Sequence, residues 1–156
     1  MQNRVGALRN ALGPGIAGGL VAGAIAQAYL LASVVFVAHA SGAIAFYQYV
    51  ASALVGKAAY ADANDAWLGI VVLFAASALW GAGYAYVANE LQQLRERPFV
   101  SGIGYGVVVY FAMQLMEVAA AIYRTPNTFA LVNGLVAGML FFGVPLAYFV
   151  RLRTAR

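Results

Sequence analysis

Residues 66–89 read AWLGIVVLFAASALWGAGYAYVAN and include no charged side chain. A helix of roughly 20 mainly apolar residues is long enough to cross about 30 Å of bilayer hydrocarbon. Three further stretches meet this condition, at residues 14–40, 99–122 and 127–150. The sequence therefore predicts an all-α polytopic membrane protein in which residues 1–156 form a single membrane domain, a four-transmembrane-helix bundle.

The composition excludes several classes of protein. The chain is 64% hydrophobic and 9% charged, and its mean hydropathy is +0.81, whereas a soluble domain is about 45–50% apolar and about 25% charged. A soluble enzyme, a disordered tail and a nucleic-acid-binding module are therefore excluded, and the expected surroundings are the lipid bilayer. With no cysteine and one histidine, His39, the chain lacks the usual ligands of a metal site, so we expect no metal and no cofactor.

Prolines mark the predicted starts of three helices. Pro14 and Pro98 stand where a helix leaves its first N–H groups unpaired, so the missing donor costs nothing. The run Thr125-Pro126-Asn127 precedes the fourth apolar stretch in the same way. We therefore expect the first helix to begin at Pro14 and the third at Pro98.

A shorter apolar stretch, residues 43–60, is either an interfacial or re-entrant helix or a fifth span. Charge separates these readings, because Lys and Arg concentrate in cytoplasmic loops. Four spans place seven basic residues inside and two outside, whereas a fifth span leaves four inside and five outside. The count favours four spans with both termini cytoplasmic. The inner residues are then Arg4, Arg9, Arg95, Arg97, Arg151, Arg153 and Arg156, and the outer ones are Lys57 and Arg124.

Small residues recur at four-residue spacing along three of the predicted spans. In a membrane such residues let helices approach closely, because lipid provides no hydrophobic drive between them. We expect tight packing within one bundle, with a seam between two copies as the alternative. Pro145, inside the fourth span, is expected to kink that helix. The packing glycines are Gly15, Gly19 and Gly23, Gly102 and Gly106, and Gly134 and Gly138.

One ionisable residue lies clearly inside a predicted span, and it marks the candidate site. Glu117 belongs to the third span, and Gln114 lies one turn away on the same face. Asn133 of the fourth span and His39 of the first fall at similar depth, so we expect these four to form one polar cluster. An intramembrane ionisable group suggests a proton, cation or headgroup site, while interhelical hydrogen bonding is the structural alternative. Gln27, at mid-span, is expected to bond to a neighbour such as Tyr110 or a backbone carbonyl.

Three stretches carry a resemblance, 49–56 (YVASALVG), 97–106 (RPFVSGIGYG) and 131–138 (LVNGLVAG), the last followed by Gly143-Val-Pro145. They resemble segments of a group of uncharacterised bacterial inner-membrane proteins with four spans. The resemblance implies a multi-pass protein of the bacterial inner membrane. That group has no assigned activity, so no activity is implied.

The chain departs from this group at three positions. Such proteins carry a histidine where Leu73 stands here and another where Gly138 stands, and Glu117 is not part of their pattern. Any chemistry that depended on those histidines is absent from this chain.

Three functions are compatible with the sequence. The first is a non-catalytic accessory or assembly subunit, or a small homo-oligomer, because no Ser–His–Asp arrangement or other catalytic constellation is evident. Its partners would be other membrane subunits or further copies of itself. The second is a small carrier or channel for protons or a lipid-like molecule, built around Glu117. The third is an enzyme acting on a lipid or isoprenoid.

Overall fold

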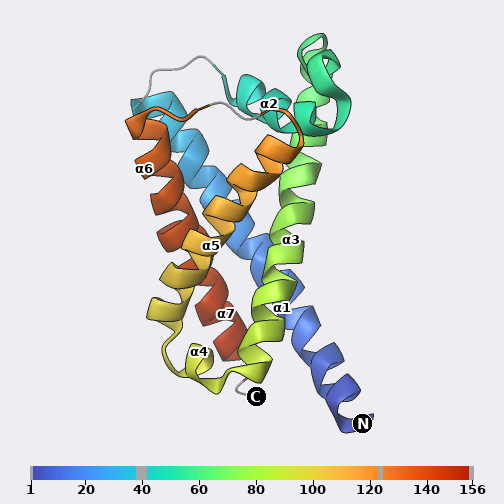
Figure 1. Cartoon of the computed structure of the whole chain (residues 1–156), viewed down its shortest axis with the longest axis vertical. Helices are drawn as coiled ribbons and strands as arrows, with labels where there is room; N and C mark the ends of the chain where they lie inside the picture. Colours follow the sequence, from blue (N-terminus) through green and yellow to red (C-terminus); the bar gives the residue numbers. More distant parts are fainter. Residues whose placement is uncertain (1, 38–41, 123–124, 155–156) are drawn as a thin grey trace.

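The computed structural model describes the backbone of residues 2–37, 42–122 and 125–154. Nearly all of these residues are helical, and none of them is in a strand. The predicted all-α fold is confirmed. Figure 1 shows long helices running between two ends of the molecule: one carries the short helix α2 (Ala43–Val55), and the other carries both termini and α4 (Gln92–Glu96). We call these the α2 end and the terminal end.

Four helices are long and apolar enough to cross a membrane. The protein is therefore an integral, multi-pass membrane protein. The first membrane-length segment, Leu12–Phe36, lies in α1 (Gln2–Ala32) and η1 (Ser33–Val37), and the second, Ala63–Glu90, is made of η3 (Ala63–Asp65) and α3 (Ala66–Glu90). The third, Pro98–Ala119, is α5. The fourth, Thr128–Arg153, joins α6 (Thr128–Val136), η4 (Ala137–Gly143) and α7 (Val144–Thr154).

Several helix limits differ from the expected ones, and those of the first and third helices have a clear physical reason. The prediction that the first helix begins at Pro14 was wrong, because α1 extends back to Gln2 with Pro14 inside it. A proline within a helix removes one backbone donor without ending the helix. The third helix, α5, ends at Ala119, short of the expected 122, where Ala121 takes a positive φ of 57°. Such a left-handed residue stops the helical repeat.

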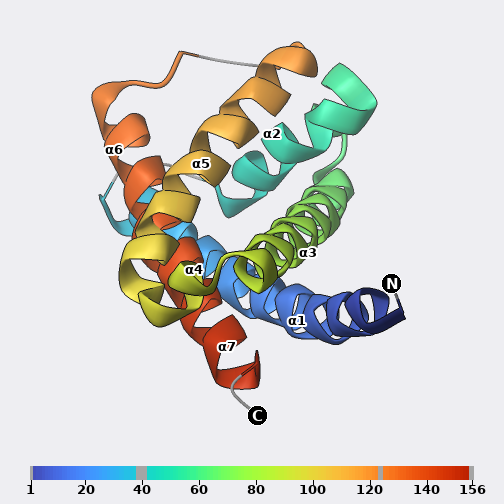
Figure 2. The same ribbon diagram turned by 60° about the horizontal axis from the view of Figure 1, so that its bottom comes forward.

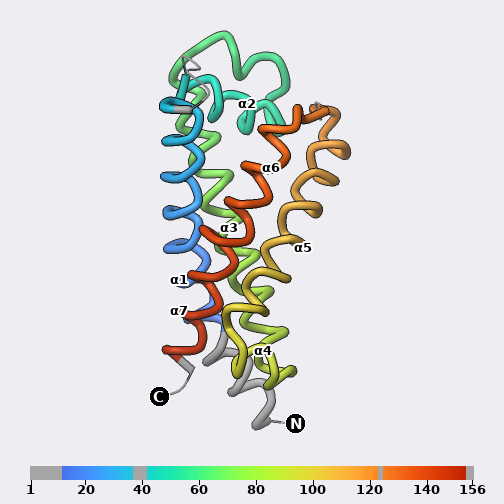
Figure 3. The backbone as a smooth tube through the Cα atoms, turned by 90° about the vertical axis from the view of Figure 1, so that its left-hand side faces the viewer, coloured from blue at the N-terminus to red at the C-terminus, as the bar shows by residue number. Residues whose placement is uncertain are grey.

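The stretch expected as an interfacial or re-entrant helix forms α2, followed by the 3₁₀ turn η2 (Gly56–Tyr60). Glycines bound α2, and φ is 157° at Gly42 and 63° at Gly56, values that glycine adopts more easily than other residues. Figure 3 shows α2 across one end of the bundle, and Figure 2 shows it between α3 and α5. Gly69 lets the α2 backbone at Tyr47 approach α3 closely.

The glycines expected at helix contacts lie at contacts within the chain. On α1, a Cβ at Gly15 would stand 2.5 Å from the Cβ of Ala85, and Gly19 and Gly23 meet α3 at Ser77. On α5, Gly102 and Gly106 face the backbone of η4 at Gly143 and Gly138. Gly134 of α6 lies against the ring of Tyr110, which belongs to α5. The bundle therefore joins α1 to α3 and α5 to η4 through surfaces without side chains.

The fourth span widens into the π-helical turns of η4 immediately before Pro145. A proline lacks the N–H that an α-helix would use at that position, and π-helical turns are one way of accommodating an interrupted ladder. This is the place at which the sequence predicted a kink.

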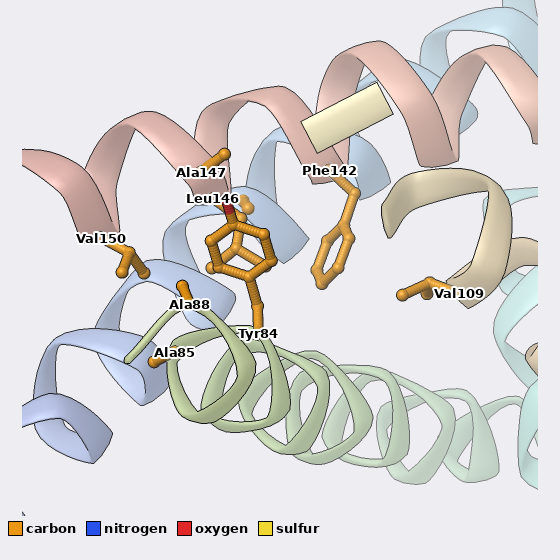
Figure 4. Packing of buried hydrophobic residues seen from close by; sticks show 9 residues of the cluster. Tyr84, Ala85, Ala88, Val109, Phe142, Leu146, Ala147 and Val150 are labelled. Atoms are coloured by element: carbon orange, nitrogen blue, oxygen red, sulfur yellow. The ribbon is translucent and has the colours of Figure 1, made fainter. Parts of the chain in front are cut away.

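The apolar core lies toward the terminal end. Tyr84, Leu146 and Val150 are almost completely buried, and Phe142 and Val109 extend the cluster toward the middle of the bundle. Figure 4 shows Tyr84 of α3 directed toward Leu146 and Phe142 of the fourth span. The hydroxyl of Tyr84 shares a hydrogen bond of 2.9 Å with Ser101. This end of the bundle is thus closed by packing and by satisfied polar groups.

Candidate functional site

A cavity of about 210 Å³ lies among α1, α3, α5 and the α6–η4 part of the fourth span. It occupies the bundle between the apolar core and the α2 end, and Val109 and Phe142 belong both to that core and to the cavity wall. Figure 3 shows α5 diverging from α3 toward the α2 end. Toward the terminal end, a hydrogen bond connects α5 to α3: Tyr105 Oη donates to the carbonyl oxygen of Trp80 at 2.6 Å.

Small residues make room for the cavity, and aromatic residues supply its surface. Gly23, Gly134 and Gly138 line it without side chains. Trp80 and Tyr110 bring rings from α3 and α5. Ser77 also lines it, but its hydroxyl already donates to the carbonyl oxygen of Leu73 at 2.7 Å. Most of the cavity wall is therefore apolar, and its polar character comes from a few side chains.

Gln27 of α1 is the most deeply buried of these polar side chains, with 7% of its surface exposed. Its Oε1 accepts a hydrogen bond of 3.3 Å from Tyr47 Oη of α2. Burial raises the pKa of the Tyr47 hydroxyl, so this hydroxyl keeps its proton and remains a donor. The Nε2 atom of Gln27 is buried and has no hydrogen-bond partner.

Gln114 and Glu117 of α5 line the same cavity. Gln114 Oε1 is buried without a partner, whereas Glu117 Oε2 accepts a hydrogen bond of 2.9 Å from Tyr49 Oη of α2. The cavity therefore contains one amide donor and one amide acceptor that are not satisfied, on two different helices. Leaving such a buried group unpaired costs about 1–3 kcal/mol.

The expected cluster of four polar residues is only partly assembled. Asn133 does not line the cavity with Glu117; its Nδ2 donates to Ser33 Oγ at 2.8 Å. Gln27 bonds to Tyr47 rather than to Tyr110 or a backbone carbonyl, because α2 folds back between the spans. His39 lies outside the described residues.

Sequence reasoning missed both tyrosines of α2. Tyr47 and Tyr49 are spaced by two residues, which does not place them on one face of a helix, and no pattern in the sequence pairs them with polar groups on α1 and α5. A tyrosine near an apolar stretch is ordinary in a membrane protein. Only the position of α2 reveals that these hydroxyls meet Gln27 and Glu117.

A second pocket, of about 320 Å³, lies at the α2 end. Tyr49, Lys57 and Tyr60 line it from the α2 side, and residues 120–122 line it from the end of α5. Since Tyr49 lines this outer pocket and its hydroxyl bonds to Glu117 of the inner cavity, the Tyr49–Glu117 contact joins the walls of the two spaces.

Within the described part of the chain, no group of three or more Asp, Glu or His residues could hold a metal ion. Leu73 and Gly138, the two positions at which the resemblance expects histidine, both line the inner cavity and add only apolar surface. Comparison of the chain with protein-family models, with curated proteins and with solved structures found no match.

Proposed function

We propose that this protein is a non-catalytic membrane carrier that binds a small, mainly apolar molecule in the inner cavity. The observation that carries this proposal is the cavity of about 210 Å³ in which Gln27 Nε2 and Gln114 Oε1 are buried without partners. Buried polar groups in native proteins are normally hydrogen-bonded. A bound molecule would supply the missing partners.

The size of the cavity limits the ligand. An apolar cavity of about 150 Å³ inside a protein binds benzene, so a cavity of about 210 Å³ accepts a molecule of one ring or a short branched chain. The aromatic surfaces of Trp80, Tyr110 and Phe142 favour a flat or apolar body. Such molecules dissolve in lipid and would reach the cavity from the bilayer.

The two ends of the cavity differ in a way that suits a carrier. Toward the terminal end, the Tyr105–Trp80 hydrogen bond and the apolar core close it. Toward the α2 end, the Tyr49–Glu117 contact joins its wall to that of the outer pocket. Breaking the hydrogen bonds of one tyrosine hydroxyl costs less than repacking a core, so we propose that the ligand exchanges at the α2 end.

We also infer that the protein lies in the bacterial inner membrane with both termini in the cytoplasm, because of the distribution of Lys and Arg and the resemblance described above. The α2 end, with the outer pocket, would then face away from the cytoplasm. The role of accessory subunit or homo-oligomer stays a prediction, and native mass spectrometry from nanodiscs tests it. The seven packing glycines do not favour it over a carrier, since they lie at contacts within the chain.

Fluorescence tests the proposed cavity, because Trp80 lines it and the chain's other tryptophan, Trp67, is 63% exposed. In the Trp67→Phe protein in nanodiscs, bromobenzene should quench Trp80 in a saturable way. Ala76→Leu fills the cavity wall and should abolish saturation, whereas Ala75→Leu, on the neighbouring exposed position, should not. Quenching that never saturates, or that survives Ala76→Leu unchanged, would overturn the proposal.

A further inference from the structure

We infer that the inner cavity selects a neutral ligand whose polar group both accepts and donates a hydrogen bond, such as an alcohol or a phenol. This inference rests on the proposed function and names the chemical class of its ligand. Gln27 Nε2 is a donor that needs an acceptor, and Gln114 Oε1 is an acceptor that needs a donor. A hydroxyl group offers both, whereas a ketone or an ether offers only an acceptor, and a hydrocarbon offers neither.

The Gln27 amide is held in place by a hydrogen bond, and Gln114 lines the same cavity from another helix. The Gln27 side chain is 93% buried and its Oε1 is bound by Tyr47 Oη, so its Nε2 is the part that remains for a ligand. Gln114 lines the cavity from α5, one turn before Glu117. The two unsatisfied atoms therefore come from α1 and α5, the helices that the ligand would bridge.

The charges around the cavity exclude an anionic ligand. Among the described residues that line it, none is Lys, Arg or His, and Glu117 is the only carboxylate. A carboxylate or phosphate ligand would enter an apolar space without a counter-charge, which is strongly unfavourable. The aromatic and small residues of the wall instead match the apolar body of a neutral alcohol.

A water molecule is the competing occupant of these two amides. Water would satisfy the same atoms, but it would leave most of a cavity of about 210 Å³ empty, and apolar cavities of this kind stay dry and take up apolar molecules. A ligand that combines an apolar body with a hydroxyl group fills the space and satisfies both amides. The two alternatives predict different ligand selectivity.

Three ligands of nearly equal size test the inference: toluene, benzaldehyde and benzyl alcohol. Each is titrated against bromobenzene on the Trp67→Phe protein in nanodiscs, with concentrations corrected for partition into the bilayer. Benzyl alcohol should bind about tenfold more tightly than toluene, with benzaldehyde between them, because each satisfied buried amide adds a few-fold. Equal affinities for the three would overturn the inference and leave the carrier proposal standing. Failure of all three to displace bromobenzene would overturn both.

Two variants assign the selectivity to the two amides. In Gln27→Leu the advantage of benzaldehyde over toluene should disappear, because the donor is gone. In Gln114→Leu the advantage of benzyl alcohol over benzaldehyde should disappear, because the acceptor is gone. Gln48→Leu is the matched control, since Gln48 bonds to the Asp62 carbonyl oxygen outside the cavity. If a variant fails to fold, the ligand series on the protein with both amides intact remains decisive. If Gln27→Leu and Gln114→Leu fold and the order of the three affinities is unchanged, the ligand does not bond to these amides and water is their partner.

Discussion

The hydroxyl of Tyr49 lies 2.9 Å from Oε2 of Glu117 and 3.1 Å from the carbonyl oxygen of Ile122. One side chain of α2 thus reaches both the last turn of α5 and the backbone that follows it. Because α2 also donates to Gln27 of α1 through Tyr47, its two tyrosines contact two of the helices that line the inner cavity. The position of α2 therefore depends on polar contacts as well as on its packing against α3.

Removing the Tyr49 hydroxyl should loosen α2. In Tyr49→Phe the contacts to Glu117 and Ile122 are lost, and a hydrogen bond between membrane helices is worth about 0.6–1.7 kcal/mol. Hydrogen exchange of the amides in Ala43–Val55 should then accelerate about three- to twentyfold. Tyr60→Phe is the control, because Tyr60 is 45% exposed and lies outside these contacts. Equal exchange in both variants would contradict a tethering role for Tyr49.

Two glycines two residues apart on α5 should respond differently to alanine. A Cβ at Gly106 would collide with the backbone of Gly138, whereas a Cβ at Gly104 meets nothing within 4 Å. Gly106→Ala should therefore lower the free energy of unfolding by about 1–3 kcal/mol. Gly104→Ala should leave it unchanged or raise it by up to about 1 kcal/mol, since alanine favours helix. Unfolding in mixed micelles measures both, and equal effects would contradict the close α5–η4 contact.

Asn133 should couple to Ser33 and not to Glu117. Its Nδ2 lies 2.8 Å from Ser33 Oγ, and direct partners show an interaction energy, whereas sites without shared contacts are additive. A double-mutant cycle with Asn133→Ala and Ser33→Ala should give about 0.6–1.7 kcal/mol. The same cycle with Asn133→Ala and Glu117→Gln should give nearly zero. Strong coupling to Glu117 would restore the single four-residue cluster that the sequence suggested.

Cysteine labelling should place the two ends of the bundle on opposite sides of the membrane. The chain has no cysteine, so each introduced thiol is unique. A membrane-impermeant maleimide should label Ala61→Cys, beside α2, in intact cells, but should label Gln93→Cys, in α4, only after the membrane is opened. Both positions are exposed. The reverse pattern would overturn the proposed orientation, and labelling of both in intact cells would contradict their separation.

The fold class and the four spans are readable from the apolar runs, because a bilayer demands about 20 apolar residues and pairs every backbone group within one helix. These requirements are local, so a single segment such as residues 66–89 meets them without reference to the rest of the chain. The spacing of Gly15, Gly19 and Gly23 likewise indicated which face of the first span would pack closely. It did not indicate that the partner would be α3.

The site depends on which helix faces meet, and that is decided only by the tertiary structure. Membrane helices that are apolar on all sides carry little amphipathic pattern to identify their inner face. Gln114 and Glu117 could be placed on one face by their spacing, but Asn133 turned out to bond to Ser33, and Gln27 to Tyr47. The cavity between them arises because α5 diverges from α3 beneath α2. The local rules of helix formation determine the spans, whereas long-range packing determines which polar groups are left for a ligand.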